Sequence, residues 1–265
     1  SLNTKEEVEN YRTQLDKDNE KALLDELIKE IEDYKKANPT VLDNANELDK
    51  TTLDNLIAKA KTDTSNPNNL PSKEEIAQKI SNLKEAYNKI KRDYVTNSLR
   101  EKINKEIEAY GDLSSQDQNA LKNQVTEASA PNLEDLLQKQ KENQKIVEKA
   151  KELKGLQHLN TNKVNEAITG LVNAFGNDDK QTEIIDLAKA KDTAINNLSE
   201  LNGLRVPTTA IQNFTANISD KDTIANLEAY KEQTEAAKKA AEAILASKID
   251  PSSQQLFLDK IGEDK

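Results

Sequence analysis

Cysteine, methionine and tryptophan are absent from this 265-residue sequence. Without cysteine the chain can form no disulfide, no thiolate nucleophile and no cysteine-ligated zinc site. Glycine and proline are scarce, with six residues of each. No apolar run approaches the roughly 20 residues that a membrane-spanning helix needs. Any membrane anchor is therefore expected to lie outside this segment.

Apolar residues are also few. They make up 35% of the chain, below the roughly 45–50% of typical globular proteins. Charged residues make up 32%, the net charge is -10, and lysine and glutamate are interspersed. This composition excludes one large core and favours several small cores between amphipathic helices. The acidic balance also excludes a general nucleic-acid partner, because phosphate contacts need basic clusters.

An apolar triple recurs at nearly fixed intervals along the chain. The copies are Ile107-x-x-Tyr110-x-x-Leu113, Leu153-x-x-Leu156-x-x-Leu159, Leu198-x-x-Leu201-x-x-Leu204 and a fainter Ala243-x-x-Ala246-x-x-Ile249. The successive spacings are 46, 45 and 45 residues. Each triple ends a helix and is followed by a polar loop and another helix. A constant period of this length is typical of a stacked helical array.

Capping residues and breakers delimit the predicted helices. Thr4 and Glu7 form a capping box before a helix that reaches about residue 36, and residues 40–47 are predicted to be a polar loop. The apolar stripe of this first helix is predicted to contain Val8, Tyr11, Leu15, Ala22, Leu23, Leu27, Ile31 and Tyr34.

A second capping box, Ser72 and Glu75, precedes a stretch with no breaker until Gly111, which is predicted to be its C-cap. At 1.5 Å per residue this helix would span roughly 60 Å, and we expect two bundles to share it. Further helices are predicted over residues 48–61, 115–128, 131–156, 160–175, 178–201, 207–218, 219–246 and 251–261. Ser219-Asp220 is the predicted cap of the helix that ends at Ala246.

The sequence therefore predicts an all-α fold, an elongated string of three-helix bundles in which each bundle is long–short–long. Long helices are expected to be shared between neighbouring bundles. The predicted divisions are 1–97, 98–146, 147–191, 192–248 and a truncated unit over 249–265. A single long coiled coil is the alternative, but strict heptads do not persist across the proline and glycine stops.

Three stretches resemble repeats of bacterial surface proteins. Residues 187–198 with Gly203-Leu204 resemble the opening helix of the GA module, an albumin-binding unit of streptococcal surface proteins. The repeated apolar triples resemble the giant staphylococcal matrix-binding protein, and residues 48–97 resemble the FIVAR repeat of that adhesin. The composition also resembles the variable adherence-associated antigens of mycoplasmas. These resemblances imply an adhesin.

No residue pattern predicts catalysis. The single histidine, His158, lies between two leucines at a helix end with no partner ligands in the sequence around it. Acidic pairs such as Glu6-Glu7 are too numerous for one to stand out, and thin bundles offer few clefts. No P-loop or Rossmann fingerprint occurs. We therefore expect no enzyme activity, no cofactor and no metal.

Aromatic side chains are the candidates for partner binding, since they often anchor interfaces. Most of the tyrosines fall on apolar stripes and are expected in cores, whereas Phe214 and Tyr230 are the candidates for exposed anchors. The resemblance implies an aromatic near the start of the short helix of an albumin-binding unit. Residues 206–211 contain none, so the resemblance does not extend to albumin binding.

Two functions remain from the sequence. The first is a cell-surface adhesin segment that attaches to host cells or to host or matrix proteins through exposed helix faces. The second is a stalk that holds another binding domain away from the cell. Both place the chain outside the cell, anchored by a lipid or wall signal beyond this segment, and both expect a monomer. An intracellular spectrin-like scaffold is a third possibility.

Overall fold

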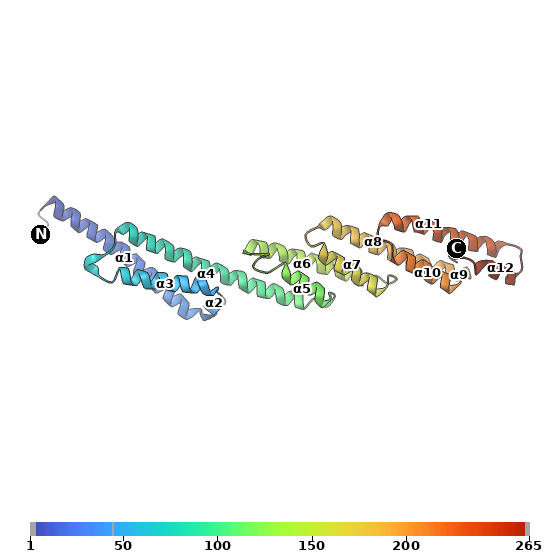
Figure 1. Cartoon of the computed structure of the whole chain (residues 1–265), viewed down its shortest axis with the longest axis horizontal. Coiled ribbons are helices and arrows are strands. Elements are labelled where there is room, and N and C mark those ends of the chain that lie inside the picture. Colours follow the sequence, from blue (N-terminus) through green and yellow to red (C-terminus); the bar gives the residue numbers. More distant parts are fainter. Residues whose placement is uncertain (1–3, 44, 263–265) are drawn as a thin grey trace. The chain divides into compact units, whose positions relative to one another are not determined.

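The computed structural model describes residues 4–43 and 45–262. Every regular element in these ranges is helical, which confirms the all-α prediction (Figure 1). The chain divides into two compact units. The first is Ser1–Ile103 with Asn132–Leu136, and the second is Asn104–Pro131 with Leu137–Lys265.

Three helices build the first unit: α1 (Lys5–Ala37), α3 (Glu47–Asp63) and most of α4 (Lys73–Glu108). The predicted capping box at the start of α1 is present. The Glu7 backbone N–H donates to Thr4 Oγ1 at 3.1 Å, and the Thr4 N–H donates to Glu7 Oε2 at 2.9 Å. Ser72 and Glu75 form the same pair of bonds before α4, at 3.2 and 2.8 Å. These bonds satisfy N–H groups that a helix start otherwise leaves unpaired.

The loop predicted over residues 40–47 is wrong in part. A short helix, α2 (Pro39–Asp43), occupies its first half. Proline at the first position of a helix costs no hydrogen bond, because that N–H has no partner inside the helix. Val41 and Ala45 are buried in the core of the first unit. Burial of these two apolar side chains therefore favours an ordered turn. A 3₁₀ turn, η1 (Pro67–Asn69), interrupts the later loop.

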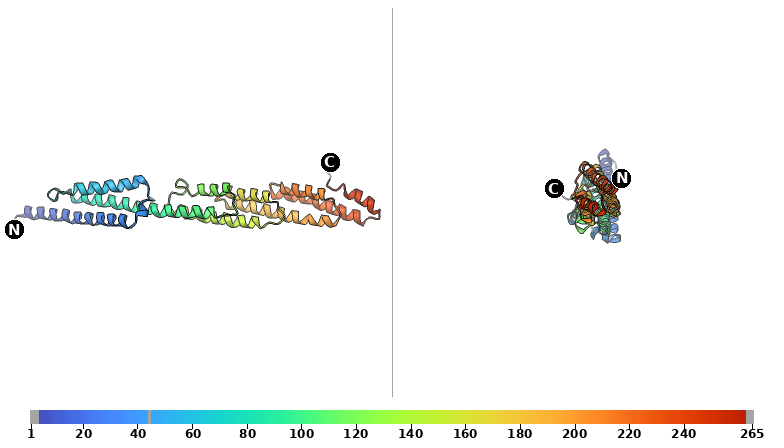
Figure 2. Two further views of the ribbon diagram at one scale, coloured as in Figure 1. Left: turned by 90° about the horizontal axis from the view of Figure 1, so that it is seen from below. Right: turned by 90° about the vertical axis from the view of Figure 1, so that its right-hand side faces the viewer.

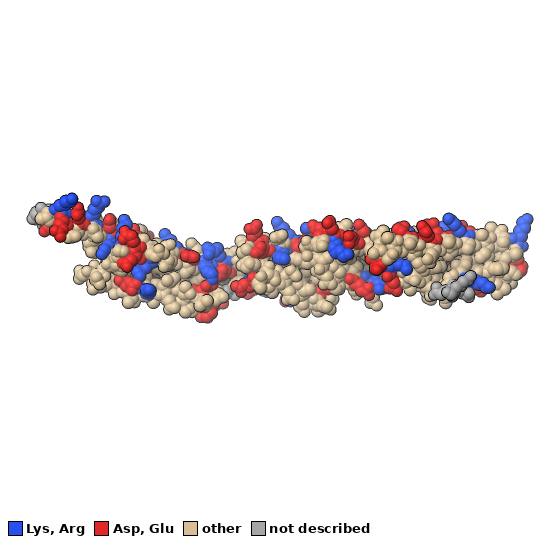
Figure 3. Space-filling model, turned by 45° about the horizontal axis from the view of Figure 1, so that its top comes forward, with Lys and Arg blue, Asp and Glu red and all other residues tan. Residues whose placement is uncertain are grey.

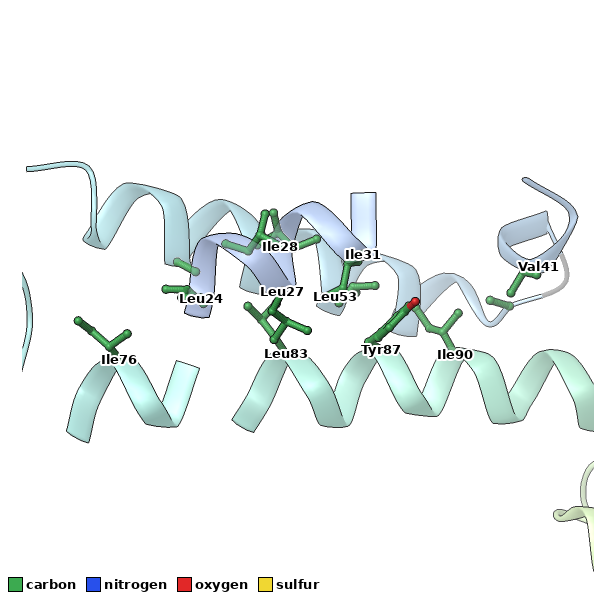
Figure 4. Close-up of a cluster of buried hydrophobic side chains, with 13 residues drawn as sticks. Leu24, Leu27, Ile28, Ile31, Val41, Leu53, Ile76, Leu83, Tyr87 and Ile90 are labelled. Carbon is green, nitrogen blue, oxygen red and sulfur yellow. The ribbon is translucent and has the colours of Figure 1, made fainter. Parts of the chain in front are cut away.

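The core of the first unit lies between α1, α3 and α4 (Figure 4). It is built mainly from Leu24, Leu27, Ile28, Ile31, Leu53, Ile57, Ile76, Leu83, Tyr87 and Ile90. The rings of Tyr34 and Tyr87 meet edge to face at 5.4 Å between centroids. Burial of each aliphatic side chain contributes about 1.5–3 kcal/mol by transfer from water.

The stripe predicted on α1 is partly wrong. Leu24 is buried, whereas its neighbour Leu23 is exposed. Val8, Tyr11 and Leu15 are exposed as well. Val8, Tyr11 and Leu15 are exposed because the α3–α4 connection reaches α1 only near Lys17. The Lys17 Nζ donates to the Leu70 carbonyl at 3.3 Å. The first half of α1 extends past this point.

Helix α4 runs without interruption from Lys73 to Glu108. It therefore continues past residue 97, the predicted end of the first bundle, as expected for one long helix. It ends three residues before Gly111, in a turn in which Leu113 N–H donates to the Tyr110 carbonyl at 3.1 Å. Gly111 does not have a positive φ, so it does not act as the predicted left-handed C-cap.

The second unit begins with the last residues of α4 and continues through eight further helices. They are α5 (Ser115–Asn123), α6 (Leu133–Lys154, in this unit from residue 137 onward), α7 (Thr161–Asn173), α8 (Asp178–Asn197), α9 (Ser199–Gly203), α10 (Thr208–Ser219), α11 (Ile224–Ala246) and α12 (Pro251–Leu258). Two boundaries differ from the sequence prediction. Helix α8 breaks at Leu198, and Thr223 rather than Ser219-Asp220 caps α11.

Helix α8 takes part in two cores of the second unit. It contacts α7, and it also contacts α10 and α11 (Figures 1 and 2). Its beginning is joined to α6 through Gln181, whose Nε2 donates to Glu142 Oε1 at 2.7 Å and whose Oε1 accepts from Lys149 at 2.6 Å. Its far end contributes Ala194 and Leu198 to the core shared with α10 and α11. Helix α8 therefore packs against helices that precede it and helices that follow it in the chain.

In three pairs of long helices, α1–α4, α4–α6 and α6–α8, the second half of one helix lies beside the first half of the next. Tyr34 of α1 meets Tyr87 of α4, and Glu106 of α4 accepts from Gln140 of α6 at 2.9 Å. Lys149 of α6 donates to Gln181 of α8 at 2.6 Å, which is the same arrangement. Helix α11 differs, because Glu200 of α9 pairs with Lys238 in its second half. In both units, side chains from the second half of one long helix therefore contact the first half of another.

Asn143 of α6 is a polar residue inside the second unit. It is 1% exposed, and neither its amide oxygen nor its amide nitrogen has a hydrogen-bond partner among the described residues. Replacing it by the similarly sized leucine is expected to raise the free energy of unfolding by about 1–3 kcal/mol, because an unpaired buried amide carries a desolvation penalty of that size. Urea unfolding followed by circular dichroism measures this gain.

The matched control is Gln144→Leu on the exposed face of the same helix, where a change within about 0.5 kcal/mol is expected. Equal effects of the two substitutions, or a loss of stability on Asn143→Leu, would contradict an unpaired amide in this core.

Candidate interaction surfaces

The structure places one of the two predicted aromatic anchors in a core. Phe214 of α10 is 8% exposed and packs in the cluster with Ala210, Ile218 and Leu227. Its ring meets that of Tyr230 edge to face at 6.4 Å. The prediction that Phe214 is exposed is therefore wrong, because α11, α12 and Gly262 cover the face of α10 that carries it. Tyr230 is half-buried, with Lys221 Nζ 4.5 Å from its ring centroid.

His158 lies on an exposed loop, and only its backbone is used by the fold. The N–H groups of His158 and Leu159 both donate to Asp192 Oδ1 of α8, at 2.6 and 2.7 Å. Asp192 thus fixes the connection between α6 and α7 to the next long helix. Bonds from backbone N–H groups to a carboxylate are stronger than neutral ones.

Replacing Asp192 by alanine is expected to destabilise this connection by about 1.5–3 kcal/mol, the range for hydrogen bonds to a charged group. Amide hydrogen exchange at residues 155–160 is the direct readout and should accelerate. Asp186→Ala, on the exposed face of α8, is the control and should leave that exchange unchanged. Unchanged protection of the loop in both variants would show that Asp192 does not hold it.

Over the described ranges, no group of three or more histidine, cysteine, aspartate or glutamate side chains is arranged to hold a metal ion. Across those same ranges, no helix has the length and apolar character needed to cross a bilayer. What the helices present instead is a surface on which acidic and basic side chains are interspersed (Figure 3). Contacts with another macromolecule would be made on such faces.

An open cleft lies within the second unit, among α5, α6, α7 and the start of α8. It is open to solvent, with a volume of about 660 Å³. Its lining includes Gln124, Lys139, Lys145, Phe175 and Asp178. Smaller clefts of about 520 Å³ beside the α3–α4 connection, about 330 Å³ between α8 and α11, and about 260 Å³ between α3 and α4 are lined mainly by charged and polar side chains.

Phe175 distinguishes this cleft from the three smaller ones, whose linings contain no aromatic residue, because it brings a half-buried ring to the surface. The Lys139 ammonium lies 4.9 Å from the ring centroid, within the range of a cation–π interaction. On the same wall, Lys145 Nζ lies 3.2 Å from Asp178 Oδ2. The hydrogen bond to Asp178, together with the charges of Glu142 and Asp178, raises the pKa of Lys145, so this lysine stays cationic.

The sequence does not single out Phe175 as a binding residue, and the reason is local. It lies three and four residues after Val172 and Leu171, so it continues the buried stripe of α7 and is interpreted as core. The helix ends at Asn173, and Gly176 takes a positive φ of 75°. The chain therefore turns at this point and leaves the ring at the edge of the cleft. Gly176, which directly follows Phe175, is the one feature of the sequence that indicates this turn.

Comparisons with protein-family models, with curated proteins and with solved structures give no significant match.

Proposed function

We propose that this chain is a segment of a bacterial cell-surface adhesin, which attaches to host cells or to host or matrix proteins without enzymatic activity. The resemblance of its repeats to GA and FIVAR units supports this function. The observation that carries the proposal is the cleft of the second unit, where the half-buried ring of Phe175 is flanked by Lys139 and Lys145. Aromatic side chains are enriched at protein interfaces, where a polar rim surrounds them.

The proposed partner is an extracellular protein that places an apolar side chain against Phe175 and a carboxylate near Lys139 or Lys141. All of the groups named are on one face of the second unit. A single open cleft gives modest affinity, since little surface becomes buried. Many copies on one cell would raise the apparent affinity through avidity. The proposed location is the bacterial surface, with the anchor outside this segment.

The experiment is binding of the purified chain to cultured epithelial cells, fibronectin, immunoglobulin and albumin, measured on immobilised targets. We expect binding to at least one cell or matrix target, and a loss of about tenfold or more on Phe175→Leu or Lys139→Glu, the change that removal of a hot-spot contact produces. Lys84→Glu, on an exposed face of α4 in the first unit, is the charge-matched control and should bind normally.

The stalk function predicts the opposite result, in which the segment binds none of these targets at any concentration. One observation favours it. Ion pairs of the fold itself line the three smaller clefts: Glu200–Lys238, Asp49–Lys89 and Asp63–Lys79. If the segment binds none of the four targets, the adhesin function is contradicted and the stalk function is favoured. Binding that neither Phe175→Leu nor Lys139→Glu changes would have the same consequence.

A further inference from the structure

Asn202 is the only asparagine in the sequence that is followed directly by glycine. It lies near the end of α9, on the surface of the second unit. Asparagine is a thermolabile residue. Its loss begins when the backbone nitrogen of the next residue attacks the side-chain carboxamide, so the size and freedom of that next residue set the rate. Glycine has no side chain to obstruct the attack and permits the widest range of backbone conformations.

The carboxamide of Asn202 is accessible for this reaction. The residue is exposed, and its side chain has no hydrogen-bond partner among the described residues. Gly203 is exposed as well. Apart from its neighbours in the chain, no heavy atom lies within 4 Å of the position that a Cβ of Gly203 would occupy. Neither steric cover nor a side-chain hydrogen bond therefore separates the Asn202 carboxamide from the Gly203 nitrogen.

Helix α9 restrains the backbone at this point only weakly. It is a single turn of five residues, its N-cap residue Leu198 makes no side-chain cap bond, and Gly203 is its last residue. Helix ends open at a small cost in free energy, because few hydrogen bonds hold them. A brief opening of this one turn is enough to bring the Gly203 nitrogen to the side chain of Asn202.

Asn97 provides a contrast within the same chain. It also precedes a small residue, Ser98, but it lies in the interior of α4. Its side-chain oxygen accepts a hydrogen bond from the Arg100 guanidinium. An attack at Asn97 would require the helix to open in its interior, whereas an attack at Asn202 requires only the opening of a helix end.

We propose that Asn202 is a site of spontaneous deamidation, which converts it mainly to isoaspartate. The Gly203 nitrogen forms a bond to Asn202 Cγ and loses its proton, and ammonia leaves, which gives a five-membered succinimide. Water then breaks one of the two bonds from the ring carbonyls to this nitrogen. Cleavage at the side-chain carbonyl gives aspartate, and cleavage at the main-chain carbonyl gives isoaspartate. The net reaction consumes water and releases ammonia.

Isoaspartate would change a connection that holds α12. Arg205 has a φ of 61°, a left-handed conformation that is rare for a residue with a side chain. Its N–H donates to the Asn202 carbonyl at 3.3 Å, and its guanidinium donates to Gln255 Oε1 of α12 at 2.9 Å. Isoaspartate adds a methylene to the main chain and turns that carbonyl into a carboxylate outside it. Arg205 would therefore shift, and its bond to α12 would weaken.

The experiment is incubation of the whole chain at neutral pH and body temperature, followed by peptide mass spectrometry. Deamidation raises the mass of the peptide that contains residue 202, and an isoaspartyl methyltransferase labels the isoaspartate in it. We expect Asn202 to react at least about tenfold faster than Asn97, which corresponds to a barrier that is lower by about 1.4 kcal/mol.

Gly203→Ala is the matched variant for the reaction. Gly203 does not have a positive φ and has open space around it, so alanine fits without strain. Its methyl group obstructs the attack, and alanine stabilises a helix by about 1 kcal/mol relative to glycine. We expect the reaction at Asn202 to slow by about tenfold or more, as a barrier higher by about 1.4 kcal/mol produces.

Asn202→Asp is the control for the structural consequence, because it adds the negative charge and keeps the normal main chain. Hydrogen exchange over residues 251–258 should accelerate in the aged parent chain as isoaspartate accumulates. It should stay unchanged in fresh Asn202→Asp and in Gly203→Ala incubated for the same time.

Three results would overturn the proposal. The first is an Asn202 that reacts no faster than Asn97. The second is an undiminished rate in Gly203→Ala, which would show that the reaction does not pass through the Gly203 nitrogen. The third is unchanged exchange over residues 251–258 after conversion, which would show that isoaspartate leaves the anchoring of α12 intact.

Discussion

Replacing Leu24 by alanine is expected to lower the free energy of unfolding of the first unit by about 2.7–5 kcal/mol. Leu24 has 0% exposure and lies in the core between α1, α3 and α4 (Figure 4). The loss combines the transfer free energy of the deleted atoms with the cavity that a close-packed core cannot fill. Hydrogen exchange over α1, α3 and α4 with urea unfolding measures it without mixing in the second unit.

Leu23→Ala is the matched control for this prediction. The residue is adjacent in the chain and identical in chemistry, yet 54% exposed. A change within about 0.5 kcal/mol is expected for an exposed site of this kind. The pair also distinguishes the structure from the simple apolar stripe, which places Leu23 inside. A larger loss at Leu23 than at Leu24 would show that α1 faces its core in a different rotation.

Replacing Ser98 by proline is expected to cost about 3 kcal/mol or more and to break α4. Ser98 is exposed and lies well inside the helix, so the proline ring touches no core residue. Its effect comes from the backbone, because proline has no N–H for the carbonyl of Tyr94 and its ring clashes with that carbonyl. Far-UV circular dichroism should report lost helix, and hydrogen exchange should accelerate over residues 90–102.

Ser98→Ala serves as the control, because alanine is the best helix former and keeps the N–H. It should leave the exchange unchanged or slow it slightly. If the proline variant keeps the helix content and protection of the parent chain, α4 is not one continuous helix through residue 98, and the sharing of that helix is contradicted.

Much of the fold can be predicted from the sequence, since local chemistry decides the helix ends. The hydroxyl–carboxylate pairs at Thr4 and Ser72, and the side chains of Asn160 and Asp250, cap helices where predicted. Such caps act within three residues, so a sequence shows them directly. The repeat period predicts the sharing of helices, because each triple must be covered by an element that follows it.

The rotation of each helix and the depth of each side chain cannot be predicted in the same way. Leu23 and Leu24 have the same hydrophobicity, and the position of α3 and α4 decides which of them is buried. The sequence places Phe214 on the surface because no local signal shows that α11 and Gly262 close over it. Val41 forms a helical turn for the same reason, since tertiary burial outweighs a polar stretch of sequence.

The candidate cleft is beyond prediction from the sequence. Its walls come from α5, α6, α7 and α8, and its aromatic residue follows a helix end instead of lying in a recognisable motif. The sequence alone does show that the chain, which has no cysteine, can form no disulfide, thiolate nucleophile or cysteine-ligated metal site. The structure identifies the Phe175–Lys139 pair in this cleft, and substitution of either residue tests whether the cleft binds a partner.

The double role of α8 has a consequence for how such a chain can change in length. Since this helix contacts helices before and after it, removing one bundle together with both of its long helices would open the neighbouring core. A deletion that leaves every remaining core whole must remove one full period of 45 or 46 residues, so that its two breakpoints fall at equivalent positions of the repeat. The length of such variants would therefore change in steps of one bundle, and each new junction would have the same contacts as the existing junctions.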